Sequence, residues 1–342
     1  MRVSSITVLD SLRRYMGESL ERIAARTAEL SSGKRILKPS DDVTAAVRAA
    51  EVKLSMANTD QYQRNIDEAL SHLGFTDTVL SSVTETLQRA KDLALTGVNG
   101  SQSAESRRSL ALEVGSLKRE LLRLANSKLR GVYVFAGFKR DTMPFDPATY
   151  AYRGDAGLIN VVTDSNESLV PLNVPGDQAF SYSLSSDETV TVDDTHYVTY
   201  RDVGGAIEVE VYDNNSTPAD DSDDTLVRSF TFSNFIDMLG QLEEALEGND
   251  VLKARALLRP IDRALDTVGD VRADVGARIG ELDTRRTRLA DHGADMATML
   301  SSLEDADYVE VVTELTQAQQ TLEALRQLAS RILPTSLFDF LR

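Results

Sequence analysis

Hydrophobic residues recur along much of the chain at alternating spacings of four and three, the pattern of helices that pack side by side. The spacing is unbroken at Leu110, Val114, Leu117, Leu121 and Leu124. It predicts a coiled-coil helix, because residues at this spacing share one face. The stretch 43–94 keeps a similar register and, at ~1.5 Å per residue, would form a rod of roughly 80 Å. Helices of this length favour an elongated bundle over a compact globule.

The same spacing returns in the last third of the chain. It is interrupted at Arg272, Arg286 and Gly293. We therefore expect another long helix there, packed in the same bundle. The positions that carry this stripe are Leu258, Ile261, Leu265, Val268, Val275, Ile279, Leu282, Leu289, Met296 and Leu303.

Both chain ends carry an apolar stripe that neither could bury alone. The N-terminal stripe comprises Leu9, Leu12, Met16, Ile23 and Leu30, and the C-terminal one Val312, Leu315, Leu322, Leu325, Ala329 and Ile332. Pairing the two helices covers part of both stripes, and packing between copies can cover the rest. The pattern favours a self-associating subunit, although two further helices of a single bundle would also fit the periodicity.

Capping and helix-breaking residues between the helices indicate where each helix starts and stops. Pro39 disfavours a helix at the residue before it, and Ser40 or Asp41 can cap the helix that follows. Ser103 can cap the next helix, and Gly131 and Gly137 are expected to close it.

Between residues 139 and 235 the apolar period changes from 3.5 to 2. In residues 189–192 and 207–212, hydrophobic and polar side chains alternate as they do in half-buried strands. Residues 218–224 are expected to form an exposed acidic loop tip. The segment from Asp141 to Phe235 has 18 acidic residues and three arginines, while the rest has 36 acidic and 34 basic ones. We predict a small acidic β-rich domain, inserted into the helical part and well solvated.

Composition excludes several classes of protein. There is no cysteine for disulfides, zinc thiolates or thiol catalysis, and the three histidines are scattered. The net charge of −17 disfavours nucleic-acid binding. No apolar run approaches the ~20 residues of a membrane span. No phosphate-binding loop or nucleophile elbow occurs, so we expect no enzymatic activity, metal or cofactor.

The fold class expected is mainly α with an inserted β domain, the long-helix coiled-coil bundle being formed by both chain ends. Three domains follow from these patterns. Residues 1–35 with 305–342 form paired terminal helices, residues 36–138 with 236–304 form a long-helix bundle, and residues 139–235 form the acidic β-rich domain.

Three short motifs resemble those of a known protein family. Residues 30–36 followed by 39–42 resemble the N-terminal hallmark of the flagellin superfamily, and residues 271–278 and 303–308 resemble its C-terminal hallmarks, in the same order. The resemblance implies that the terminal helices line the inside of a tubular assembly, the bundle forms its wall and the β domain projects outward. It also implies extracellular location on a bacterial flagellum, reached through the flagellar export apparatus with an export chaperone and without a cleaved signal peptide.

Further motifs separate branches of the superfamily. Residues 1–5, 131–137 and 336–341 resemble the members that join the hook to the filament. The resemblance implies a mechanical adaptor whose partners are other copies of itself, the preceding hook-associated protein and flagellin. A filament subunit of the flagellin type is the alternative, and a non-flagellar coiled-coil protein that presents an acidic β domain is a further one.

These considerations define the candidate residues. Gly131 and Gly137 are candidates for a hinge that sets the angle of the β domain, or for a helix stop followed by a turn with buried Tyr133 and Phe135. The residues expected at the assembly interface are Leu9, Leu12, Met16, Ile23, Leu30, Arg35, Asp41, Asp42, Arg272, Arg278, Leu315, Leu322, Leu325 and Ile332.

Overall fold

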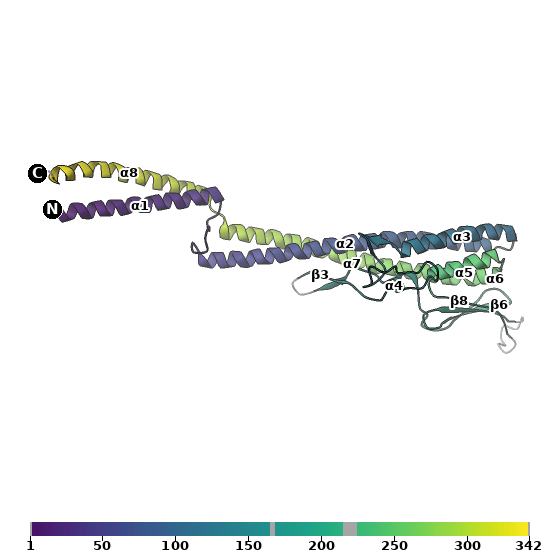
Figure 1. Cartoon of the computed structure of the whole chain (residues 1–342). Helices are drawn as coiled ribbons and strands as arrows, with labels where there is room; N and C mark the ends of the chain where they lie inside the picture. Colours follow the sequence, from purple (N-terminus) through teal and green to yellow (C-terminus); the bar gives the residue numbers. More distant parts are fainter. Residues whose placement is uncertain (1, 165–167, 215–223, 341–342) are drawn as a thin grey trace. The chain divides into compact units, whose positions relative to one another are not determined.

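The computed structural model describes residues 2–164, 168–214 and 224–340 (Figure 1). Its helices are α1 (Arg2–Ser32), α2 (Val43–Gly97), α3 (Ala104–Ala125), α4 (Gly176–Phe180), α5 (Phe235–Glu247), α6 (Val251–Ala256), α7 (Leu258–Glu304) and α8 (Tyr308–Phe340). Its strands are β1 (Lys128–Leu129), β2 (Val132–Tyr133), β3 (Asn160–Val162), β4 (Leu169–Pro171), β5 (Glu188–Thr191), β6 (His196–Asp202), β7 (Ile207–Asp213) and β8 (Thr225–Phe232). The expected fold class, mainly helical with β structure inserted in the middle, is confirmed.

The chain divides into two compact units. The first comprises residues 1–61 and 289–342, and the second residues 62–288. Both α2 and α7 run from one unit into the other. The three-domain boundaries inferred from the sequence stay a prediction. None of the described helices has the length and apolar character needed to span a bilayer.

In the second unit, α2 and α7 pack antiparallel through residues spaced seven apart. Lys91 pairs with Asp262 at 2.6 Å, and Asp77 with Arg272 at 2.9 Å, so residue numbers rise on one helix as they fall on the other. A repeat of seven keeps both seams facing each other along the helices. The fully buried seam positions are Ile66, Leu73, Leu80 and Leu87 on α2 and Ile261, Val268, Val275 and Leu282 on α7.

Helices α3 and α5 complete the bundle of this unit, and Figure 1 shows them side by side. Ser103 caps α3, its hydroxyl accepting the Ser106 N–H at 3.1 Å, as the sequence predicted. Lys118 of α3 pairs with Glu243 of α5 at 2.5 Å. The regular 4-3-4-3 stripe of α3 is buried or half-buried throughout, which confirms its assignment as a seam.

The β structure of the second unit consists of two hairpins and one larger sheet. Strands β5 to β8 form a four-stranded antiparallel sheet in sequence order. Its inner face buries Val198 and Val209, and the Tyr200 hydroxyl donates to the Ala256 carbonyl at the end of α6 at 2.8 Å. Both segments predicted as strands, 189–192 and 207–212, correspond to β5 and β7.

Some local expectations were wrong. Helix α3 ends at Ala125 and not at Gly131, because Asn126 leaves the helical conformation (φ −100°, ψ 25°), its side chain bonds to the backbone of Phe145, and the chain enters the β1–β2 hairpin. Helix α2 is capped by Asp42, whose carboxylate accepts the Ala45 N–H at 2.9 Å, and not by Ser40 or Asp41. The predicted loop tip at residues 218–224 lies outside the described residues, apart from Asp224.

The buried seam makes a direct prediction about stability. Changing Leu80→Ala should lower the free energy of unfolding by about 3 kcal/mol, because it removes buried methyl groups and leaves a cavity between long helices. Leu112, on α3 and 74% exposed, provides the matched control: Leu112→Ala should change it by less than about 0.5 kcal/mol. Urea denaturation followed by circular dichroism measures both, and equal losses would contradict the assigned core.

Candidate assembly interface

The paired helices α1 and α8 of the first unit carry the stripes expected at the two chain ends. On α1, half-buried Leu12, Met16, Ile23 and Leu30 face α8, as predicted. On α8 the facing residues are Val311, Leu315, Ala318, Leu322, Leu325 and Ala329, so Val312 was assigned one position too late and is exposed. The side chains of Leu9 and Ile332 lie outside the described residues.

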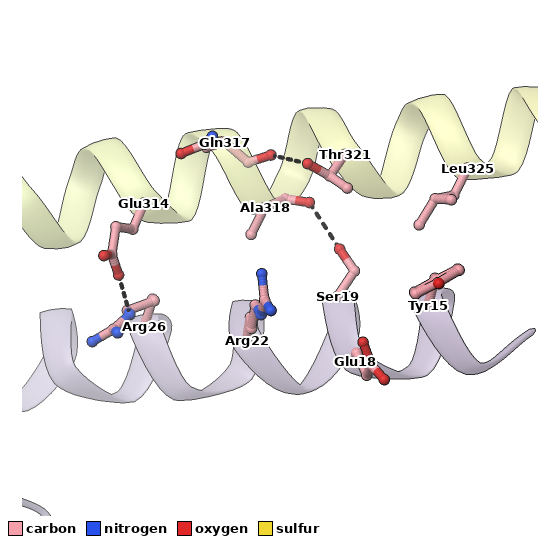
Figure 2. Close-up of a pocket in the computed structure, with 10 residues that line it drawn as sticks. All are labelled: Tyr15, Glu18, Ser19, Arg22, Arg26, Glu314, Gln317, Ala318, Thr321 and Leu325. Carbon is pink, nitrogen blue, oxygen red and sulfur yellow. Dashed lines mark hydrogen bonds and ion pairs between the residues drawn. The ribbon is translucent and has the colours of Figure 1, made fainter. Parts of the chain in front are cut away.

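Two polar residues complete the α1 stripe. Ser19 and Arg26 occupy the positions skipped between the apolar ones, so the 4-3-4-3 spacing from Leu12 to Leu30 has no break. Ser19 is only 5% exposed, and its hydroxyl donates to the Ala318 carbonyl at 3.0 Å (Figure 2). A small side chain at 318 permits this approach, and the bond satisfies a hydroxyl that would otherwise be costly to bury.

Arg26 forms a charged link one heptad along. Its guanidinium bonds Glu29 at 2.5 Å and, across the helix pair, Glu314 at 2.6 Å (Figure 2). The hydrogen bond that Arg26 donates to Glu29, followed by the charges of Glu29 and Glu314, raises the Arg26 pKa above its usual value despite partial burial. Because these side chains are partly exposed, the link adds more to the register of the two helices than to their affinity.

An open groove of about 540 Å³ runs along the α1–α8 pair (Figure 2). Its lining residues are Tyr15, Glu18, Ser19, Arg22, Arg26, Glu314, Gln317, Ala318, Thr321 and Leu325. Figure 2 shows Tyr15 and Leu325 approaching each other from opposite helices at one end of the groove. A long, open groove with mixed polar and apolar walls is suited to packing against another helix.

A second feature of the first unit ties the α1–α2 connection to the α7–α8 connection. The backbone of Lys34 forms an antiparallel bridge with Asp305. The Arg35 N–H donates to the Glu304 carbonyl at 2.7 Å, and the Ala306 N–H donates to the Gly33 carbonyl at 3.0 Å. We call this arrangement of residues 33–35 and 304–306 the clasp.

The Glu304 carboxylate is the charged centre of the clasp. It is nearly buried and bonds the ammonium groups of Lys53 and Lys34, the latter at 2.9 Å. These two hydrogen bonds and charges hold the Glu304 pKa below its usual value. Arg35 adds a bond to the Leu303 carbonyl at 2.9 Å. Glu304 and Lys53 thus join the start of α2 to the end of α7.

The predicted carboxylates beside the clasp shape the chain locally. Asp41 accepts the N–H groups of Leu37 and Lys38 at 3.0 and 2.8 Å, closing the turn before α2. Asp42 caps α2 and lies 3.5 Å from Arg35, and the bond from the Ala45 N–H lowers the Asp42 pKa. Arg35, Asp41 and Asp42 therefore lie together around this turn.

The predicted arginines Arg272 and Arg278 lie in the second unit, on α7. Arg272 pairs with Asp77 of α2. Arg278 donates to the carbonyls of Pro171 and Asn173 at 3.4 and 3.2 Å and pairs with Asp274. Each of these arginines is thus engaged within the chain, and their role in contacts between copies stays a prediction.

The two candidate hinge glycines both have positive φ. Gly131 (φ 89°) follows Arg130 (φ 51°) in the two-residue turn of the β1–β2 hairpin, a backbone shape that favours glycine. Gly137 (φ 67°) lies so close to Asp155 that a Cβ would come within 2.2 Å of its carbonyl oxygen. Their hinge role stays a prediction.

The aromatic turn between these glycines is buried, as the other interpretation of this motif expected. Tyr133 and Phe135 are at most 9% exposed. The Phe135 ring packs edge-on against Phe180 of α4, with centroids 5.0 Å apart.

Sequence reasoning missed Ser19, Arg26, Ala318, Lys53 and Glu304. For the first three a signal existed, because gaps of seven between Met16 and Ile23, Ile23 and Leu30, and Leu315 and Leu322 each conceal one seam position. Nothing in the local pattern singles out the Lys53–Glu304 pair, which is separated by 251 residues.

Comparison with known families agrees with this geometry. The bacterial flagellin N-terminal helical region matches residues 3–139, and the bacterial flagellin C-terminal helical region matches residues 258–341. Together these two regions cover most of the chain, including nearly all of α1 and the whole of α2, α3, α7 and α8. The chain belongs to the flagellin family. This is a family of structural flagellar proteins.

Individual relatives span nearly the whole chain. It is 28% identical over 321 residues to flagellar hook-associated protein 3 of Salmonella typhimurium, covering 92% of this chain and 91% of the relative. It is 25% identical over 349 residues to flagellin A of Vibrio anguillarum, covering 90% of each. Both relatives are flagellar proteins by name.

Solved structures share the fold. Flagellar hook-associated protein 3 of Legionella pneumophila superposes with a TM-score of 0.57 at 22% identity, over 74% of this chain and 98% of that one. The flagellar junction protein FlgL of the same organism gives 0.53 at 21%, over 75% and 99%.

The Ser19–Ala318 contact yields a prediction about helix pairing. Ala318→Leu should push α1 and α8 apart and remove the Ser19 bond, weakening the pair by about 1–3 kcal/mol. Amide exchange in residues 19–30 should then accelerate by about tenfold or more. Gln319→Leu, on the exposed side of α8, is the matched control and should leave exchange nearly unchanged. Equal effects of the two changes would contradict the assigned seam.

The clasp should respond to pH. Because folding lowers the Glu304 pKa, its contribution to stability is fully present above the usual carboxyl pKa and is lost as the pH falls through the lowered pKa of the folded chain. The amide resonances of Arg35 and Ala306 should report this opening in an NMR titration. Glu304→Gln should abolish the transition, whereas Glu310→Gln should preserve it. A transition unchanged in Glu304→Gln would show that other groups control the clasp.

Proposed function

We propose that this chain is a structural subunit of the bacterial flagellum that joins the hook to the flagellin filament. The observation that carries the proposal is similarity along 92% of the chain to a protein named flagellar hook-associated protein 3. Flagellins match over a similar share of the chain, but at 22–25% sequence identity, compared with 28% for flagellar hook-associated protein 3. The motifs at residues 1–5, 131–137 and 336–341 support the same branch of the family.

The paired helices α1 and α8 supply the assembly interface in this proposal. Half-buried apolar residues on both helices and an open groove between them support it, because surface left wet in one chain gains from packing against another copy. In domain terms, residues 1–35 with 305–342 line the inside of the assembly, residues 36–138 with 236–304 form the wall, and the acidic 139–235 domain faces outward.

The proposed mechanism is mechanical and involves no catalysis. One end of a layer of subunits contacts the preceding hook-associated protein, and the other contacts flagellin. The clasp can transmit force between the paired chain ends and the long helices, because it is built from hydrogen bonds and a nearly buried carboxylate. The subunit reaches this extracellular position through the flagellar export apparatus, helped by an export chaperone.

Location on the flagellum tests this function. An antibody raised against residues 139–235 should label a narrow band between hook and filament in immunogold electron microscopy of flagellated cells of the source organism. That acidic segment is distinctive in charge, and it is the part proposed to face outward. Cells lacking the gene provide the control for specificity.

Two other labelling patterns would contradict the proposal. Label along the whole filament would identify a filament subunit of the flagellin type. Label absent from flagella altogether would favour a non-flagellar coiled-coil protein that presents an acidic β domain.

A further inference from the structure

Helix α2 carries a second apolar stripe that the chain leaves uncovered. In the first unit its inward face buries Ala45, Ala49 and Thr59. On the other side, Val43, Val47 and Leu54 are each more than half exposed. Exposed alanines fill the spacing, so the stripe follows the 4-3-4-3 rule of a helix seam at Val43, Val47, Ala50, Leu54 and Ala57. We call this set the outer stripe of α2.

The outer stripe lies on the opposite side of α2 from the buried positions. Val47 comes two residues after Ala45, and two residues turn an α-helix by about 200°. A helix with seams on opposite sides is built to pack between two partners. On a helix face that stays in water, charged or polar residues could occupy these positions at no cost. Branched aliphatic side chains at this spacing therefore indicate a face that packs against a partner.

The same unit exposes a second, different apolar surface at the beginning of α8. Tyr308 and Val309 are 68% and 74% exposed, and Val312 is also exposed, whereas Val311 points into the α1–α8 seam. We call Tyr308, Val309 and Val312 the head of α8. Neither this head nor the outer stripe of α2 is covered within the described part of the chain.

The two surfaces differ in charge. Residues 34–53, which include the first part of the outer stripe, contain five basic and three acidic residues, of which Lys34 and Lys53 pair with Glu304 and Arg35 pairs with Asp42 within the chain. Residues 304–314, which surround the head of α8, contain five acidic residues and no basic one. Arg48 and Glu310 are exposed, and neither makes an ion pair within the described residues. They are available to pair with each other across an interface.

We propose that the outer stripe of α2 in one copy packs against the head of α8 in a second copy, with Arg48 beside Glu310. The inference rests on the proposed function, which requires copies to assemble. Because the two surfaces differ, each copy can offer both at once, and such heterologous contacts repeat into a ring or a helical layer. Pairing of the outer stripe with itself would stop at a dimer.

The absence of cysteine allows a direct test. Cells of the source organism would co-express Val47→Cys and Val309→Cys chains, and their isolated flagella would be oxidised under mild conditions. A mixed disulfide between the two kinds of chain can then form only where copies bring positions 47 and 309 together, and it is distinguished from 47–47 and 309–309 dimers by mass. Leu112→Cys replaces Val47→Cys in the matched control, because Leu112 is also highly exposed but lies on α3. We expect at least tenfold more mixed dimer from the 47–309 combination.

A charge swap tests the polar contact independently. Arg48→Glu should reduce the 47–309 cross-link several-fold, and adding Glu310→Arg in the same chains should restore it. Both residues are exposed, so circular dichroism of the purified variants should match that of the unaltered chain. Restoration would be specific to this pair, because a general loss of fold or export would not be reversed by a second substitution.

The outcomes separate this inference from the function on which it rests. Chains present at the junction, with no more 47–309 dimer than the control or with more 47–47 dimer, would overturn the proposed packing alone. An intramolecular disulfide in a Val47→Cys, Val309→Cys double variant, without dimer, would mean that the chain covers its own stripe and would also overturn it. Chains absent from flagella would overturn both.

Discussion

The antiparallel packing of α2 against α7 is the constraint on which the rest of the structure depends. These helices come from opposite halves of the sequence, and their buried residues repeat every seven positions. A repeat of seven aligns two helices over their length without a compact core. In the first unit, Glu304 at the end of α7 pairs with Lys53 of α2, and the clasp joins the segments that continue into α1 and α8. The chain ends are thus paired next to a contact between residues that are 251 apart in sequence.

Polar residues in the seams give these long pairs their register. An apolar stripe alone tolerates slippage by one heptad, because it would meet similar residues again. A slip of α1 along α8 would place Ser19 opposite Val311 or Leu325 in place of Ala318, and the bulkier side chain would keep its hydroxyl from the carbonyl. Arg26 would leave Glu314 in the same step. The partly exposed Arg26–Glu314 pair contributes little stability, but both positions select one alignment.

Periodicity was sufficient to predict the long helices and strands β5 and β7, because a repeat of 3.5 or 2 is local information. It also identified Leu12, Met16, Ile23 and Leu30 as facing residues. Periodicity failed where a long-range contact or a single hydrogen bond determines which residue faces inward or where a helix ends. Val312 is apolar like Val311, and only the position of α1 shows which of them faces inward. The end of α3 was misplaced because Gly131 serves a hairpin turn and not a helix end. Glu304 could not be found, since its lysine partners lie some 250 residues or more away in sequence.

The most direct test of the central claim is the phenotype of cells of the source organism that lack this chain. If it joins hook to filament, electron microscopy should show hooks without filaments, and flagellin should accumulate in the medium. Expression of the full chain should restore filaments, whereas a chain without residues 1–35, and hence without the α1 seam, should not. Filaments of normal length on cells that lack the chain would contradict the account.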